Sequence, residues 1–71
     1  MFNRARFHEA VKTRGMTLSE VAKLMKINGA TLYRKMYGIS DFTRSEIEDL
    51  RLALLLTNEE ADALFFRNES A

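Results

Sequence analysis

Residues 16–38, MTLSEVAKLMKINGATLYRKMYG, carry the start signals of two short helices close together in the chain. At Thr17 the hydroxyl can accept from the Glu20 amide while the Glu20 carboxylate accepts from the Thr17 amide, a capping box that starts a helix. Asn28 is a favoured N-cap for a second helix, and Gly38 is a favoured residue just after its C-terminal end. Two capped helices separated by about four residues have the layout of a helix-turn-helix.

The apolar residues of these two expected helices fall at helical spacing. They are Val21, Leu24 and Met25 in the first helix, and Leu32 and Met36 in the second. Residues three or four apart share a helix face, so each helix has one apolar side. The other side chains of the second helix are polar, aromatic or cationic: Thr31, Tyr33, Arg34 and Tyr37. The sequence therefore predicts two amphipathic helices that cross through their apolar faces.

The same start signals recur along the whole chain. A cap flanked by an apolar staple pair occurs at Asn3, Thr17, Asn28, Thr43 and Thr57, and three of these caps are also capping boxes. The expected helices span about 3–14, 17–25, 28–37, 43–55 and 57–67, with ends defined to within about two to four residues. Proline is absent and no segment alternates with a period of two residues. The sequence predicts an all-α fold.

Length and composition predict one small domain over residues 1–71, with a helix-turn-helix at about residues 17–37. The chain has no cysteine, which is compatible with a reducing cytosol and excludes disulfides and thiolate metal sites. Its longest apolar run, residues 52–56, is far shorter than the roughly 20 residues that cross a bilayer. We expect a cytoplasmic protein that contacts no membrane and binds no cofactor or metal.

Basic and acidic side chains are unevenly distributed. Residues 1–44 contain nine basic and three acidic side chains, a formal net charge of +6, whereas residues 45–71 contain two basic and seven acidic ones, a net charge of −5. A basic surface that neutralises phosphates releases counterions and gains affinity from their release. An ordinary solvated surface is the alternative, but the two capped helices lie inside the basic part, which favours nucleic-acid binding.

From Thr17 to Phe66 the sequence resembles the small lambda-repressor-type regulators of phages. The segment LYRKMYGISDFTRSEIEDLRLALLLTNEEADALFF is especially similar to the short repressor, Cro and repression-modulator proteins of temperate phages of Gram-positive bacteria. The resemblance covers about two thirds of the chain. It implies a five-helix lambda-repressor-like DNA-binding domain with the helix-turn-helix at helices two and three. Such proteins read operator DNA with helix three, usually as a homodimer on a palindrome.

The resemblance also implies positions for DNA contacts. The residues that would face the major groove are Asn28, Gly29, Ala30, Tyr33, Arg34 and Tyr37. Those that would hold phosphates at the starts of helices two and four are Thr17, Ser19, Ser40, Thr43 and Arg44. Independently of the resemblance, Lys12 and Arg14 oppose the negative end of helix one and can reach the DNA backbone.

The chemistry of the side chains leaves alternatives open for these contacts. Arg34 can make a bidentate contact to guanine or clamp a phosphate, or it can remain solvated. Asn28 can read adenine, but its capping role already uses the side-chain oxygen. Tyr33 and Tyr37 can lie against sugar or a thymine methyl, or they can pack on the edge of the domain.

Three residues depart from the family pattern. Leu18 stands where a glutamine often anchors the backbone, Lys26 where a glycine often makes the turn, and Lys35 where an apolar residue often packs. A left-handed Lys26 would cost about 1–2 kcal/mol, which leaves open a turn of different conformation. Met36 can supply the inward residue beside Lys35, whose ammonium can then extend to a phosphate.

Enzymatic chemistry finds little support in the sequence. The single histidine, His8, has no partner of the kind that nucleophilic or metal-assisted catalysis needs, so we interpret it as a surface residue.

The main alternative is a repressor-fold interaction module, an antirepressor or repression modulator that acts by binding another regulator. The acidic half has more apolar residues than one helix face requires, and the candidate dimer or partner contacts are Leu52, Leu55, Phe65 and Phe66. Homodimerisation, a second regulator and core packing explain these residues equally well.

Overall fold

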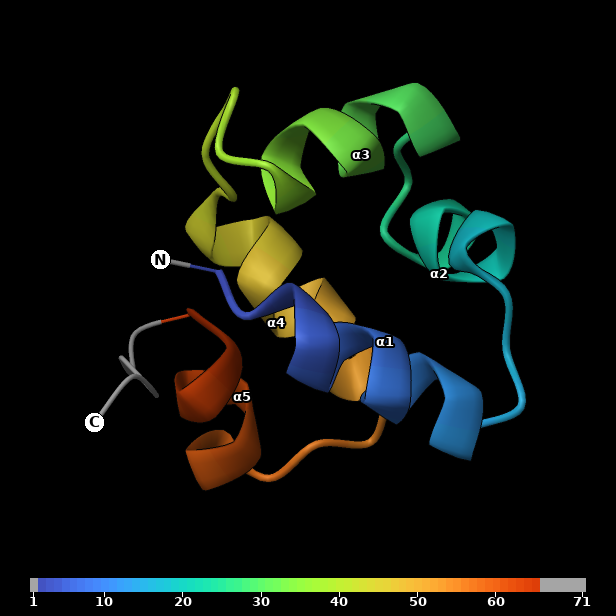
Figure 1. The fold of residues 1–71 in the computed structure, drawn as a ribbon, viewed down its shortest axis with the longest axis vertical. Helices are drawn as coiled ribbons and strands as arrows, with labels where there is room; N and C mark the ends of the chain where they lie inside the picture. The colour runs from blue at the N-terminus through green and yellow to red at the C-terminus, as the bar shows by residue number, and fades with distance from the viewer. Residues whose placement is uncertain (1, 66–71) are drawn as a thin grey trace.

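The computed structural model of this chain describes residues 2–65, which form five α-helices with no strand among them (Figure 1). The helices are α1 (Arg4–Thr13), α2 (Leu18–Leu24), α3 (Gly29–Met36), α4 (Arg44–Ala53) and α5 (Asn58–Phe65). The all-α prediction is confirmed for this part of the chain.

Each helix begins one residue after the cap predicted for it. The Asn3 and Asn28 side chains accept from backbone N–H groups three residues later, at 3.1 and 2.7 Å. Thr17, Thr43 and Thr57 each form a reciprocal capping box with the glutamate three residues later, with N–H to carboxylate distances of 2.8 Å. Local hydrogen bonds therefore set all five starts, as the sequence predicts. The expected end of the fifth helix, at residue 67, lies outside the described residues.

Four helices end in the same hydrogen-bonded reversal, with a left-handed residue just after the cap. The residues and their φ angles are Gly15 (67°), Lys26 (63°), Gly38 (78°) and Leu55 (53°). In each case the following N–H group donates to a carbonyl five residues earlier, at 2.9–3.1 Å, which is the Schellman pattern. The turn at Lys26 thus keeps the left-handed conformation without a glycine, because these hydrogen bonds offset a cost of about 1–2 kcal/mol.

The apolar faces of all five helices meet in the core. The largest side chains enclosed there are Phe7, Met25, Leu32, Leu50 and Val21. Leu24, which was expected on the inward face of α2, is 53% exposed. The packed face of α2 is centred between Val21, Ala22 and Met25, so Leu24 lies at its edge, about a quarter turn away.

The five helices are arranged so that α3 and α5 lie toward opposite ends of the molecule (Figure 1). α2 packs against both α3 and α4, while α5 packs against α1 and α4. The apolar face of α3 packs against α2. The outer face of α3 has no other described helix over it in the view of Figure 1.

Candidate nucleic-acid interface

All six residues that were expected to face the major groove are exposed on α3 or at its two caps. Leu32 and Met36 are buried and attach the helix to the core. The other side of the helix and its cap are exposed: Asn28, Gly29, Ala30, Tyr33, Arg34 and Tyr37. The structure therefore gathers these residues on one short helix.

The N-terminal end of α3 combines a capping side chain with two small residues. Asn28 Oδ1 accepts from the Thr31 N–H at 2.7 Å, which is the capping alternative for this residue. The side-chain NH₂ group of Asn28 still has donors for an external acceptor. A Cβ added at Gly29 would meet nothing within 4 Å. Another molecule can therefore approach the backbone closely at this end of α3.

Arg34 lies along the exposed side of α3. Its Nη2 donates to Thr31 Oγ1 at 3.3 Å, a contact between exposed side chains three residues apart. A guanidinium has five N–H donors in a planar fork, so most remain available for a guanine edge or a phosphate. The structure is compatible with either contact.

The two tyrosines of α3 form a stack that continues to α1. The Tyr33 and Tyr37 ring centroids are 4.5 Å apart with an interplanar angle of 30°, and the side chains are 56% and 47% exposed. The Arg4 Cζ atom lies 4.2 Å from the Tyr37 ring centroid. We call these three residues the tyrosine–arginine stack. Sequence reasoning did not single out Arg4, because no local pattern indicates a contact with a residue so distant in the chain.

Lys35 is placed differently from the expectation that it extends to a phosphate. Its Nζ forms an ion pair with Glu46 Oε1 at 2.9 Å and donates to the Asp41 carbonyl at 2.7 Å. The Lys35 and Glu46 side chains are only 10% and 16% exposed. The ammonium therefore links α3 to the start of α4, because a carboxylate and a carbonyl lie within its reach.

Glu46 serves two partners at once. Burial raises the pKa of its carboxyl, but hydrogen bonding to the Thr43 backbone and the contact with Lys35 outweigh burial and hold the pKa below its ordinary value. Glu46 is therefore the ionised link between the capping box of α4 and α3.

The remaining phosphate candidates are exposed but lie on several elements. Thr17 and Ser19 lie at the start of α2, Lys12 lies near the end of α1, and Ser40, Thr43 and Arg44 lie around the start of α4. The N–H groups of Thr17 and Thr43 are already bonded to the carboxylates of their capping boxes. Each capping box thus uses two amides at its helix start, so the backbone there is only partly available to a phosphate.

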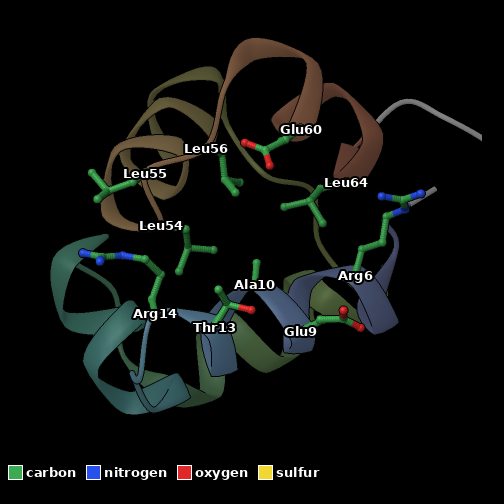
Figure 2. A pocket seen from close by; sticks show the side chains of 10 residues that line it. All are labelled: Arg6, Glu9, Ala10, Thr13, Arg14, Leu54, Leu55, Leu56, Glu60 and Leu64. Carbon is green, nitrogen blue, oxygen red and sulfur yellow. The ribbon is translucent and has the colours of Figure 1, made fainter.

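Arg14, the last phosphate candidate, lines a groove of about 660 Å³ between α1 and the segment from α4 to α5. Figure 2 shows Arg14 and Arg6 toward opposite ends of this groove. Leu54, Leu56 and Leu64 point into it from the other side. The groove thus has an apolar floor and charged ends.

The expected partner contacts divide into three cases. Leu52 and Leu55 are 56% and 68% exposed, and Leu55 borders the groove. Phe65 is buried instead, with its ring centroid 5.2 Å from that of Phe2 and 5.1 Å from that of Phe42. Phe65 therefore belongs to the core, because the N-terminal segment covers it. Phe66 lies outside the described residues.

His8 is exposed, and its ring centroid lies 6.0 Å from that of Phe7. Within residues 2–65, no three His, Asp or Glu side chains are grouped closely enough to hold a metal ion. In the same range, no helix is long and apolar enough to cross a membrane.

No protein-family model, curated protein or solved structure matches the chain.

Proposed function

We propose that this chain is a sequence-specific double-stranded DNA-binding transcriptional regulator of the lambda-repressor-like type. In this proposal α2 and α3 form a helix-turn-helix, and α3 enters the major groove of an operator. The base contacts come from the exposed face of α3, and backbone contacts come from the basic residues around it. The protein would thus act as a phage-type repressor or Cro-like regulator.

One observation carries the proposal: α3 buries Leu32 and Met36 in the core and leaves an opposite face exposed. That face ends in a guanidinium and two stacked phenol rings. It begins with Gly29 and Ala30, which permit close approach to a groove floor. Bidentate arginine contacts to guanine and small-residue contacts to the thymine methyl are standard means of reading base edges.

The proposal is tested by selecting duplexes from a random pool with the purified protein and measuring their affinity by fluorescence anisotropy. If basic residues neutralise phosphates, log affinity falls linearly with log salt, with a slope of about −0.9 for each phosphate neutralised. We expect an enriched sequence motif and a clear salt dependence. Failure of the folded protein to bind any duplex at low salt would refute the proposal.

Arg34 provides a test of base reading. We expect Arg34→Ala to weaken binding to the selected site by about 1–3 kcal/mol and to relax the preference at one base pair. Arg6→Ala removes the same charge from the groove between α1 and α5 and is the matched control. An equal loss on all sequences would make Arg34 a phosphate contact.

We further propose that two copies bind a palindromic operator, because one recognition helix covers only a few base pairs. A two-fold dimer places its recognition helices about 34–36 Å apart on one face of the duplex. Leu52 and Leu55 are exposed on the acidic half of the chain and are the candidate contacts. Pairing there would keep the acidic side chains away from the phosphates.

The same exposed leucines favour a second candidate function. Leu55 is 68% exposed and adopts a left-handed backbone conformation at an apolar groove. A hydrophobic residue in this position suits contact with another protein, so the chain can instead act as an antirepressor or repression modulator that binds another regulator. Wild-type protein that fails to bind DNA but forms a stoichiometric complex with a regulator would favour this candidate.

A further inference from the structure

The tyrosine–arginine stack connects the start of α1 to the end of α3. Tyr37 is the C-cap of α3, and its ring has Tyr33 at 4.5 Å and the Arg4 guanidinium carbon at 4.2 Å. All three side chains are exposed. A guanidinium over an aromatic ring is attracted by the ring quadrupole, and arginine also stacks on the ring plane. The stack therefore holds a cation from α1 at the surface of α3.

The backbone at Arg4 is anchored by the two residues before it. The Phe2 ring centroid lies 4.9–5.2 Å from those of Phe7, Phe42 and Phe65. The Asn3 N–H donates to the Leu64 carbonyl at 2.8 Å. The first residue of α1 is thus fixed by apolar packing and a hydrogen bond, and only its side chain extends outward to Tyr37.

The stack leaves the N–H groups of Arg4 available. The contact of the Arg4 Cζ atom with the Tyr37 ring engages none of the five N–H donors of the guanidinium in a hydrogen bond. Within residues 2–65 this guanidinium has neither an ion pair nor a hydrogen bond, whereas Lys35 nearby is neutralised by Glu46. Arg4 is therefore the cation of this region that can still pair with an external anion.

Arg4 shares a surface hollow with Ser40, one of the phosphate candidates. Tyr37, Gly38 and Phe42 also line this hollow. Asp41 also lines it but forms no ion pair with Arg4 in the described part of the chain. A guanidinium and a hydroxyl beside one hollow are suitable donors for a phosphate oxygen.

We propose that Arg4 is a DNA-backbone contact, positioned by the ring of Tyr37, that donates to a phosphate beside the C-terminal end of α3. This inference rests on the proposed function of α3. Recognition helices contact base edges mainly with their N-terminal residues, so a group at the opposite end meets the backbone. Arg4 then contributes affinity and orientation without reading sequence.

The test measures the salt dependence of DNA binding for wild type, Arg4→Ala and Arg6→Ala, on the selected duplex and on an unrelated one. We expect Arg4→Ala to reduce the salt slope by about 0.9 on both duplexes. The ratio of the wild-type affinity to the Arg4→Ala affinity should then fall by about three- to fourfold between 50 and 200 mM salt. Arg6→Ala makes the same charge change two residues away and should reduce the slope by less than half as much.

The role of the ring is tested by Tyr37→Leu, by Tyr37→Phe and by the double variant Arg4→Ala with Tyr37→Leu. Tyr37→Leu should lose as much salt slope as Arg4→Ala, although it removes no charge. Tyr37→Phe keeps the ring and should lose less than half as much salt slope as Tyr37→Leu. The double variant should lose no more slope than Arg4→Ala alone. Circular dichroism of each variant establishes that the helices are intact.

The outcomes separate this inference from the proposed function. Equal salt slopes for Arg4→Ala and Arg6→Ala would overturn the phosphate contact. A wild-type slope for Tyr37→Leu, or additive losses in the double variant, would overturn positioning by the ring. If Arg34→Ala weakens binding while Arg4→Ala does not, only the inference about Arg4 fails. If wild-type protein binds no duplex, the proposed function fails and the inference falls with it.

Discussion

Replacing Lys26 by glycine should stabilise the protein. Lys26 has a φ of 63° in the turn between α2 and α3, where a non-glycine residue costs about 1–2 kcal/mol relative to glycine. Glycine also makes the unfolded chain more flexible, which lowers the free energy of unfolding by about 0.4–1 kcal/mol. We expect a net gain of about 0.5–1 kcal/mol. In a domain of this size, 1 kcal/mol corresponds to a rise in Tm of about 4–8 °C.

Urea unfolding followed by circular dichroism measures this gain. Lys26→Ala is the matched control, because it removes the charge but keeps the Cβ, and it should give no comparable gain. The reverse change, Gly38→Ala, should destabilise by about 1 kcal/mol, since φ there is 78° and an added Cβ would meet nothing within 4 Å. Equal stability of Lys26→Gly and Lys26→Ala would refute the assignment of strain to the backbone.

Three further predictions concern packing, pH and assembly. Leu32→Ala should cost about 2–5 kcal/mol in urea unfolding, because Leu32 is buried between α3 and the core, and a loss below about 0.5 kcal/mol would contradict that packing. Because the pKa of Glu46 is lowered in the folded protein, its contribution to stability is present above the pKa of the unfolded chain and is lost as the pH falls through the lowered pKa. Glu46→Gln should therefore flatten the acid side of the stability–pH curve, and an unchanged curve would exclude its link to Lys35. Leu52→Glu combined with Leu55→Glu should reduce the sedimenting complex on a palindromic duplex from two copies to one, whereas an unchanged stoichiometry would place the dimer contact elsewhere.

The starts of the helices could be predicted closely because capping is local. At Thr17 and Thr43 both partners of each hydrogen bond lie within four residues of sequence, and the structure contains both boxes. The inward face of α3, formed by Leu32 and Met36, was also predictable from spacing. Leu24 was misplaced because α2 has only seven residues, and the direction of so short a helix depends on the helices it contacts.

The contacts that the sequence did not predict join distant residues. Lys35 reaches Glu46 only because α3 and the start of α4 are brought together in the fold, so its ion pair left no local pattern. The contact between Arg4 and Tyr37 likewise depends on how the start of α1 is anchored against α5. In the same way, Phe65 is covered by Phe2, whose position no periodicity specifies.

An NMR titration of the isotopically labelled protein with its selected duplex decides whether α3 binds DNA, because it reports both binding and the surface that binds. We expect the largest amide shifts in α3, in the turn before it and at Arg4. These shifts should be reversed by added salt. Absence of any shift at low salt, or shifts confined to the groove between α1 and α5, would contradict DNA binding through α3.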